Sequence, residues 1–524
     1  MELTSSVAVG LSVLAVVLAY KIWKTINFFS DRNIPYLPGL WPLGSSMKVA
    51  FLRKHYGSVW TEMYHKLAPH KIGGLFMYGK PIVMVRDLDY INRVYVTDFS
   101  HFVDRGFTVD EKKDPLDGHM FFLSGDKWKY LRNKLSPIFT SGKLKWMFEQ
   151  MKGSSDKFVT AFEKKIPLGK DTCLKEDFAR FTTDVISSCA FGIESNAMGD
   201  PDSKMREMGK KFFDPNLSEM FKFFARFTFP ALLALFKIRT TSLELTNFFV
   251  GLVKQTMSHR MSTGYVRKDF IQLLLELKQK GYVEVADKDE EQNGNHKEKK
   301  NGSFDALNGS NAQKEVIALD DGVLAAQLFV FFIAGFETTA STLHYATYLL
   351  SVNQSCQDKA REEARKCYEK NGEFTYDSLK ELQYIENCVN ETLRLMPPVP
   401  MNFRVCTKDY TFPNGTHIEK GQSILLPTIA IHYDPKIFPE PEKFIPDRFD
   451  GSIEKGSYAP FGDGPRICIG KRFAVVEIKL TLAKLLLNYK FLPAASKPNL
   501  REMVVGSIVL NPKDDLQVRV EKIE

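Results

Sequence analysis

The sequence is poor in tryptophan and cysteine, and its cysteines are not spaced for disulfides or zinc. Its 524 residues include 5 tryptophans and 7 cysteines. An odd number of cysteines without paired spacing argues against the disulfide framework of a secreted protein and indicates a reducing compartment. The chain has no CxxC pair, so a zinc site built on that spacing is excluded as well.

Other absences narrow the class of protein further. No GxGxxG segment follows a predicted strand, so the chain has no dinucleotide-binding unit of its own. The formal net charge is +8, but the basic residues do not gather in a run that would indicate a nucleic-acid partner. From about residue 45 to the end there is no internal repeat. These absences favour a globular body that relies on another protein for any nucleotide cofactor.

One uncharged apolar run stands near the amino terminus. Val7–Tyr20 is followed at once by Lys21 and Lys24. A cleaved signal peptide is one interpretation, but its positive charges precede the apolar core and it ends in an A-x-A site, which is absent here. A membrane anchor is the other; the run is short against a span of about 20 residues, although uncharged residues before it extend it. We favour the anchor, with the body on the cytoplasmic side, where the positive charges lie.

Three regions follow from this pattern. Residues 1–24 are predicted to anchor the chain, and residues 25–44, which contain closely spaced prolines, to form a stiff hinge. Residues 45–524 form the predicted catalytic domain. Within it, residues 287–313 are rich in Asn, Gly, Lys and Glu and almost lack large apolar side chains. We therefore predict a disordered surface loop there, either a tolerated insertion or a docking segment.

Helical spacing of apolar residues dominates this domain, so we predict a mainly α fold with small β-sheets. A phenylalanine-rich stretch, residues 212–236, predicts either a buried helix pair or an amphipathic element that dips into a bilayer and roofs an apolar pocket. Strands are predicted at residues 76–85, as a hairpin with its turn at Gly79–Pro81, and at 422–426 and 503–510. Helices are predicted at residues 50–66, 126–135, 141–166, 174–191, 241–262, 267–280, 315–350, 353–370, 376–395 and 471–487.

The most informative stretch is Phe461–Gly470, with the sequence FGDGPRICIG. A single cysteine, Cys468, stands among glycines just before a helical pattern. A cysteine at the beginning of a helix has its thiolate favoured by the helix dipole and by backbone N–H groups without partners. The glycines allow a tight turn and a close approach to a flat cofactor. The alternative is a Gly-Pro turn around a buried structural cysteine, which is our interpretation of the other six cysteines.

This stretch resembles the haem-ligand signature of the cytochromes P450. The resemblance rests on Phe461, Gly464, Arg466, Cys468 and Gly470. It implies the P450 fold, in which a long distal helix and a proximal cysteine loop enclose haem b (iron protoporphyrin IX). Cys468 is then the iron ligand, and thiolate donation favours O–O cleavage over oxygen storage. Further motifs, in the family's order, extend the resemblance from the anchor to about residue 510.

The second motif interrupts the apolar segment 324–350 with Ala334-Gly-Phe-Glu-Thr-Thr339. Glycine and threonine are weak helix formers, and a carboxylate such as Glu337 is costly in apolar sequence unless it is paired or functional. A helix with a packing glycine is the plain interpretation. By resemblance to the family's distal helix, Thr338 donates a hydrogen bond to the bound dioxygen and Glu337 relays protons from solvent.

The third motif joins Glu391, Arg394 and Arg448. Glu391 and Arg394 stand three residues apart on a predicted helix, and Arg448 follows in Pro-Asp-Arg-Phe. An i,i+3 ion pair alone is common on solvated helices and worth little. The resemblance implies that these three residues lock the haem side of the fold and take no part in a chemical step.

The resemblance also assigns cations to the haem propionates. Trp128 and Arg132 stand four residues apart, so they share one face of a helix. By resemblance they hold a propionate, and Arg105, Arg404 and Arg466 make further contacts. A plain surface charge is the alternative for Arg105.

A substrate pocket is implied beside the distal helix, near Thr338. Many of its expected walls are aromatic, which favours lipophilic, aromatic molecules. The expected lining residues are Phe107, Met120, Phe121, Phe122, Phe213, Phe331, Phe332, Ala334, Phe336, Val399, Met401 and Phe403.

Residues 102–106, 139–144 and 404–409 are similar to insect microsomal members of the family-6 type. This resemblance implies monooxygenation at the cytoplasmic face of the endoplasmic reticulum membrane. It names NADPH–cytochrome P450 reductase as the route from NADPH, and cytochrome b5 as a further partner. An acidic reductase would dock on basic residues near the cysteine side, namely Lys127, Lys129, Lys134, Lys471, Arg472 and Lys479.

Our leading hypothesis for the biological role is detoxification of insecticides or plant toxins. A rival within the same class is a hydroxylase of an endogenous hormone, steroid or fatty acid, and breadth of substrate turnover would separate the two. A rival of a different class is a non-catalytic haem sensor or carrier. The complete motifs around Thr338 and Cys468 argue against that rival.

Overall fold

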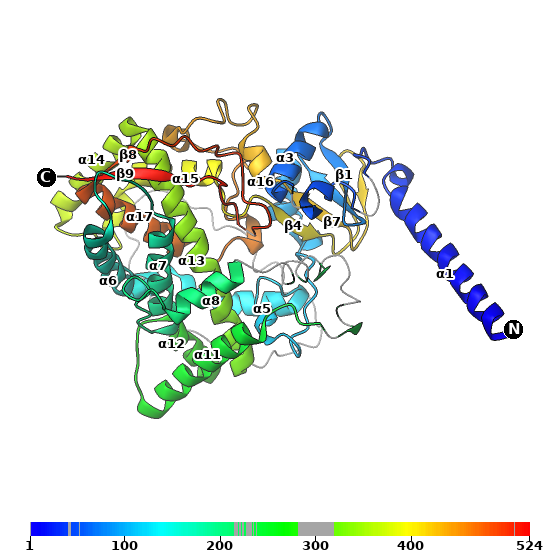
Figure 1. Cartoon of the computed structure of the whole chain (residues 1–524), viewed down its shortest axis with the longest axis horizontal. Coiled ribbons are helices and arrows are strands. Elements are labelled where there is room, and N and C mark those ends of the chain that lie inside the picture. Colours follow the sequence, from blue (N-terminus) through cyan, green and yellow to red (C-terminus); the bar gives the residue numbers. More distant parts are fainter. Residues whose placement is uncertain are drawn as a thin grey trace.

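The computed structural model describes residues 2–39, 43–51, 53–213, 238–280, 319–507 and 509–523, together with residues 218, 222, 225, 226, 233, 235 and 236. Helices make up most of this part of the chain, and in Figure 1 small sheets lie at opposite sides of the helical body. The predicted mainly α architecture with small sheets is confirmed. The loop predicted at residues 287–313 and most of the phenylalanine-rich stretch at 212–236 lie outside the described residues.

One long helix, α13 (Asp321–Val352), runs through the body and is contacted by α7, α11, α15 and α17. It is apolar on every side because neighbours cover it all round. The other helices are α1 (Glu2–Ile26), α2 (Met47–Ala50), α3 (Tyr56–Lys66), α4 (Leu88–Asn92), α5 (Gly125–Leu135), α6 (Ser141–Lys165), α7 (Lys175–Ile186), α8 (Lys204–Phe213), α11 (Leu243–Thr263), α12 (Phe270–Lys280), α14 (Gln354–Asn371), α15 (Gln383–Leu395), α16 (Thr428–His432) and α17 (Lys471–Asn488).

The sheets lie on either side of this helical body (Figure 1). The larger has the strand order β1-β2-β7-β4, with β2 and β7 parallel and the other pairs antiparallel. A second has the order β3-β9-β8, and β5 pairs with β6. The strands are β1 (Ile72–Met77), β2 (Lys80–Val85), β3 (Asp171–Cys173), β4 (Asn402–Val405), β5 (Tyr410–Thr411), β6 (His417–Ile418), β7 (Ser423–Leu426), β8 (Tyr489–Pro493) and β9 (Gln517–Lys522).

The strand predictions are correct in part. A hairpin is present at β1 and β2, but its turn is Tyr78-Gly79, both at positive φ, and Pro81 already lies within β2. The strand expected at 422–426 is confirmed as β7. The strand expected at 503–510 is wrong: among its described residues, only Met503 makes a bridge, and Gly506 turns the chain at a φ of +84°.

The amino-terminal helix α1 projects away from the body (Figure 1). Among the described residues, one helix is long and apolar enough to cross a membrane, namely α13. Because 72% of its apolar window is buried inside the protein, α13 is a core helix. The anchor at residues 1–24 and the hinge at 25–44 stay predictions.

Candidate active site

The cysteine loop runs from Phe461 to the beginning of α17. The backbone N–H of Cys468 donates to the carbonyl of Phe461 (2.9 Å), which closes the loop. Gly464 has a φ of +66°, and a Cβ there would lie 1.8 Å from the carbonyl oxygen of Tyr95, so only glycine fits. A Cβ at Gly470 would meet no atom within 4 Å, so this side of the loop faces open space.

The thiol of Cys468 lies among protein atoms yet keeps accessible surface, so it borders an opening in the fold. Burial raises the pKa of Cys468 above its ordinary value, while the N–H of Gly470 and then Arg132 and Arg105 lower it. The backbone N–H that was expected to favour the thiolate therefore acts in that direction, but burial outweighs it. A metal ion bound to the sulfur would reverse the balance, because coordination deprotonates a thiol.

The long helix α13 exposes one small area in an otherwise buried stretch. Between Leu324 and Ser351 every residue is buried except Ala334, Gly335 and Thr338. The hydroxyl of Thr338 donates to the carbonyl of Ala334 (2.6 Å). Glu337 beside them is buried, with 7% of its surface exposed. The motif thus places a hydroxyl and an adjacent buried carboxyl at an opening in the helix packing.

Four arginines gather around the cysteine loop: Arg105, Arg132, Arg404 and Arg466. Arg404 is fully buried and donates through Nη1 to the carbonyl of Phe403 (2.8 Å), whereas its Nε and Nη2 have no hydrogen-bond partner in the described structure. The Nε of Arg132 is likewise buried without a partner there. Buried donors without acceptors are costly, so these guanidinium groups point to a ligand that supplies acceptor oxygens.

The charges of these arginines also crowd one another. Burial lowers the pKa of Arg466 to about 8, and the charges of Arg105, Arg404 and Arg132 act in the same direction. Burial lowers the pKa of Arg105 to about 9, again with Arg404 as the next cause. A guanidinium stays protonated in proteins, so the direction of these shifts indicates that burial, and after it the neighbouring positive charges, disfavours the charged groups here. An anion bound among the four would relieve it.

Helix α5 contributes Trp128 and Arg132 from one face, as predicted, and both are buried. The guanidinium carbon of Arg466 lies 3.9 Å from the centroid of the Trp128 ring. Arg466 also donates to the carbonyls of Val103 and Leu123, each at 2.9 Å. Arg466 therefore fastens the cysteine loop to the segment that precedes α5, in addition to adding charge to the cluster.

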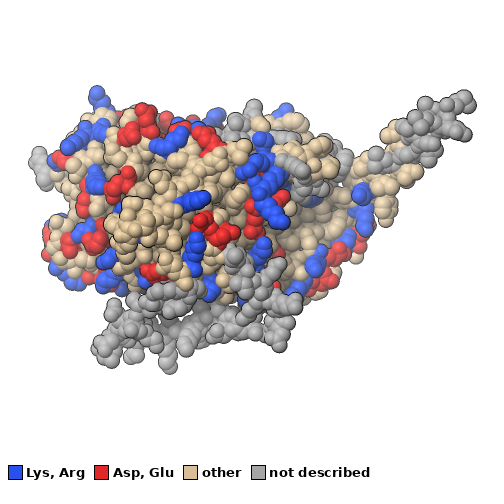
Figure 2. Space-filling view, turned by 90° about the horizontal axis from the view of Figure 1, so that it is seen from below, with Lys and Arg blue, Asp and Glu red and all other residues tan. Residues whose placement is uncertain are grey.

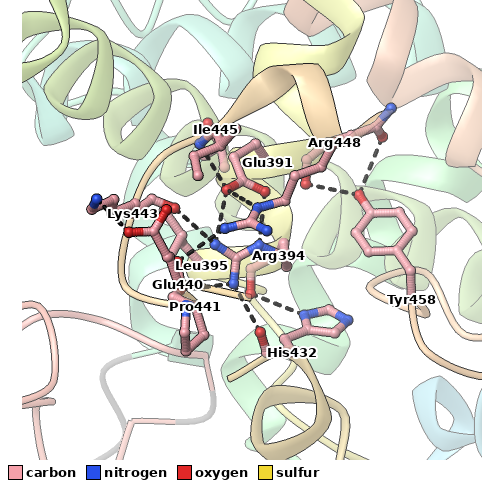
Figure 3. Close-up of polar contacts among 12 residues, drawn as sticks. Glu391, Arg394, Leu395, His432, Glu440, Pro441, Lys443, Ile445, Arg448 and Tyr458 are labelled. Carbon is pink, nitrogen blue, oxygen red and sulfur yellow. Dashed lines mark hydrogen bonds and ion pairs between the residues drawn. The ribbon is translucent and has the colours of Figure 1, made fainter. Parts of the chain in front are cut away.

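Glu391, Arg394 and Arg448 meet in the core (Figure 3). Nε and Nη2 of Arg394 donate to the two carboxylate oxygens of Glu391 at 2.7 and 2.8 Å, and Nε of Arg448 reaches one of them at 3.4 Å. Arg394 also donates to the carbonyl of His432 (2.8 Å), and the N–H of Ile445 donates to Glu391 (2.9 Å). The three residues predicted to act together tie α15 to two later segments of the chain.

A group of aromatic rings stands beside the arginine cluster. The ring centroid of Phe107 lies 4.4 Å from that of Phe122 and 5.7 Å from that of Phe121. Phe121 is 42% exposed, whereas Met120 and Phe122 are buried. The guanidinium carbon of Arg105 lies 4.2 Å from the Phe121 centroid. These candidate pocket residues therefore form one wall with the cluster.

The structure buries Phe332 and Phe336 away from the exposed area of α13, so their place in the pocket lining stays a prediction. Both side chains are fully buried, with their rings 5.2 Å from Phe249 of α11 and 5.3 Å from Phe213 of α8, respectively. Each stands two positions from Ala334, about 200° round the helix, so both point away from the exposed area. The half-buried Phe213 packs behind α13 with them.

The remaining candidates are distributed differently. Phe331 is buried with its ring 5.2 Å from that of Phe139, so it belongs to the helical core. Val399 is exposed, and Met401 and Phe403 are partly buried against the larger sheet. These three stay candidates for the pocket.

Two features of the site were not found from the sequence. Gln327 of α13 forms hydrogen bonds with the backbone of Gly118 and Met120, on either side of His119. The sequence feature that could have indicated this role is the presence of an amide side chain in an otherwise apolar helix. Asp114 accepts hydrogen bonds from the N–H and hydroxyl of Thr240 (3.0 and 3.2 Å), and Asp117 accepts from that hydroxyl (3.1 Å). Asp114 and Thr240 are 126 residues apart in the chain, and no sequence pattern links the two segments that hold them.

Comparison with known proteins gives consistent matches over nearly the whole chain. The family model for cytochrome P450 matches residues 34–518. Three proteins of Drosophila melanogaster are similar. Probable cytochrome P450 6a14 is 35% identical over 523 residues, 97% of each chain. Cytochrome P450 6a8 is 34% identical over 521 residues, 97% of each. Probable cytochrome P450 6d5 is 34% identical over 525 residues, 98% of this chain and 99% of the relative.

Proposed function

Because the chain belongs to the cytochrome P450 family and is a P450 monooxygenase, we propose that Cys468 and the arginine cluster hold haem b and that the enzyme oxidises lipophilic foreign molecules. The electrons come from NADPH through NADPH–cytochrome P450 reductase. The observation that carries the haem assignment is the arginine cluster beside an accessible cysteine. Among the described residues, the four guanidinium groups have one carboxylate partner, Asp104 at 3.6 Å from Arg466, and such an excess of positive charge suits a cofactor that bears two carboxylates.

The residues present fit this cofactor. Cys468 would supply the sulfur ligand and the open side of Gly470 would accept a flat ring, while the N–H groups of Arg132 and Arg404 that lack partners among the described residues would bind the propionates. Arg105 and Trp128 complete the cradle. When bound, a haem with a thiolate ligand supplies oxygen activation and transfer of one oxygen atom.

Replacing Arg404 with methionine is expected to lower the fraction of purified protein that holds haem by about tenfold, the effect of losing one charge-assisted hydrogen bond. Within the described part of the chain its Nε and Nη2 have no hydrogen-bond partner, so the loss is expected to fall on the cofactor. The haem-to-protein absorbance ratio measures this. Arg361→Met is the matched control, because Arg361 is satisfied by Leu486 and Gln357. Equal haem content in both variants would contradict the assignment.

The part of the distal helix around Thr338 handles protons. The Thr338 hydroxyl, now held by the Ala334 carbonyl, stands at the exposed area and can turn its proton into the site. Glu337, one residue earlier and buried, is placed to pass protons inward from solvent. Burial of the surrounding helix keeps bulk water away from this route.

Thr338→Ala is expected to keep the thiolate-type spectrum while product formed per NADPH falls by about tenfold and peroxide rises, because a positioned proton donor is lost. Product, NADPH and peroxide are measured together. Thr339→Ala is the control, since that side chain is buried at 2% exposure. Unchanged coupling in Thr338→Ala would count against the proposed proton route.

One exposed basic region supports a redox partner. The reductase would dock near the beginning of α17, where Lys471 and Arg472 are exposed. Lys479, which was predicted to belong to the same docking surface, is buried and forms an ion pair with Glu386 (2.7 Å), so it does not contribute to that surface. On the face in Figure 2, basic and acidic side chains are interspersed. Cytochrome b5 stays a further candidate partner.

Helix α1 supports an anchor in the endoplasmic reticulum membrane, with the catalytic domain on the cytoplasmic face. It projects from the body (Figure 1). Apolar side chains are exposed all along its described part, at Leu11, Val13, Val16, Val17, Leu18, Tyr20, Trp23 and Ile26. A soluble body would not leave such a helix uncovered without a partner surface such as lipid.

The substrate class follows from the aromatic wall at Phe107, Phe121 and Phe122, which suits lipophilic, aromatic molecules. The deciding experiment incubates the reconstituted enzyme with reductase, NADPH and a panel of insecticides, plant toxins, steroids and fatty acids, and follows the gain of one oxygen by mass spectrometry. Oxidation of several foreign molecules is expected. Oxidation of a single steroid or fatty acid would instead indicate a biosynthetic hydroxylase, and no NADPH consumption at all would favour a haem sensor.

A further inference from the structure

Gln327 is a fully buried amide in the apolar helix α13. Its Nε2 donates to the carbonyl of Gly118 (3.0 Å) and to the carbonyl of Val323 (3.1 Å). Its Oε1 accepts from the N–H of Met120 (3.0 Å). One side chain thus bonds both a C=O and an N–H of the same short segment of the chain, as a neighbouring strand would.

The segment held in this way, residues 118–123, carries groups that face the cofactor cradle. The carbonyl of Phe121 accepts from Arg105 (3.3 Å), and the carbonyl of Leu123 accepts from Arg466 (2.9 Å). The carbonyl of Met120 accepts from Arg466 as well (3.4 Å). The same segment supplies the side chains of the aromatic wall. The segment therefore contacts the arginine cluster, and its own position sets the shape of the aromatic wall.

We propose that Gln327 is a positioning residue that fixes residues 118–123 against α13 and thereby sets the shape of the aromatic wall for bulky ligands. It acts through Met120–Phe122 and touches neither cofactor nor substrate. The proposal rests on the proposed function, since it presumes a haem in the cradle. It assigns a selectivity role to a residue outside the three motifs that identify the family.

The reason for a selective effect is geometric. Gln327→Met keeps the length of the side chain but leaves the Gly118 carbonyl and the Met120 N–H buried and unpaired. The segment relaxes to satisfy these groups and carries the wall with it, while Cys468 keeps its own loop contacts. A ligand that only reaches the iron is unaffected, whereas a ligand that also contacts the wall is weakened.

The test uses the full-length holoenzyme and spectral titration with imidazole and 4-phenylimidazole. Gln327→Met is expected to raise the Kd of 4-phenylimidazole by about tenfold, which corresponds to one lost buried hydrogen bond, and that of imidazole by less than about twofold. The thiolate-type spectrum of the reduced, CO-treated protein is recorded in parallel. An absent spectrum in the wild-type protein would overturn the proposed function itself. A wild-type spectrum with equal changes for both azoles, or none, would overturn only the role of Gln327.

Gln357→Met is the matched control. Gln357 of α14 is also fully buried, and it bonds the C=O and the N–H of Phe491 (2.7 and 3.0 Å) on the far side of the body. Gln357→Met is expected to lower the unfolding temperature as much as Gln327→Met does. It should leave the ratio of the Kd values for 4-phenylimidazole and imidazole unchanged. If Gln327→Met does not fold, Gln327→Glu keeps the acceptor for Met120 and should shift selectivity by about threefold. Wild-type selectivity in a folded Gln327→Glu protein would contradict the proposal.

Discussion

Replacing Cys468 with alanine is expected to abolish turnover and the thiolate-type spectrum of the reduced, CO-treated protein. The sulfur borders an opening in the fold and is the only atom that the loop at residues 461–470 would offer iron as a soft ligand. Without it, haem can stay in the arginine cradle but lacks the ligand that favours O–O cleavage. Absorbance spectra and product formation with reductase and NADPH measure both losses.

The matched control for that variant is Cys356→Ala, which removes a half-buried thiol from α14. It is expected to keep the wild-type spectrum and wild-type turnover within about twofold, since most substitutions away from a site change stability only slightly. A Cys468→Ala protein that retained both properties would show that the iron ligand is another residue.

Replacing Arg394 with leucine is expected to lower the free energy of unfolding by about 3–5 kcal/mol, because it leaves a fully buried carboxylate without its main partner. Glu391 and Arg394 are both 0% exposed, and Arg394 additionally serves three backbone carbonyls. Since folded domains are stable by only about 5–15 kcal/mol, most of the margin would be lost. Urea unfolding of the purified variant measures the change.

Arg365→Leu is the control for the ion pair. Arg365 and Glu362 have the same i,i+3 spacing, but their side chains are 55% and 42% exposed. Exposed pairs of this kind contribute about 0–1 kcal/mol, so this variant should unfold almost like the wild type. If both variants lost the same stability, burial would not be the reason for the effect, and the structural role of Glu391 and Arg394 would have to be abandoned.

The sequence allowed the motifs to be located because each combines residue types that have few other uses together. The cysteine among glycines identified the loop at Cys468. The glutamate and two arginines on either side of a proline-rich segment identified the buried group of Glu391, Arg394 and Arg448. The helices were predicted from apolar spacing with ends shifted by a few residues, as expected where caps and tertiary contacts set the boundaries. Gly464 could be predicted as a turn, although its close approach to Tyr95 could not.

The pocket walls were less predictable for a physical reason. Helix α13 is buried on nearly every side, so its sequence has no polar face to show which residues look inward. Phe332 and Phe336 therefore looked equivalent to Ala334, and only the packing of α8 and α11 separates them. The strands β8 and β9, which pair with each other and, for β9, with β3, were not predicted.

The crowded arginines around the cysteine loop have a consequence for how the protein is made. Bringing four guanidinium groups together with Asp104 as their one carboxylate partner among the described residues is unfavourable, so a ligand that binds only the folded chain shifts the equilibrium toward folding by mass action. Newly synthesised chains should therefore complete their structure as haem reaches them, and those made in excess should remain substrates for chaperones and proteases. We expect the cellular abundance of the enzyme to follow the supply of haem as closely as the supply of its messenger RNA.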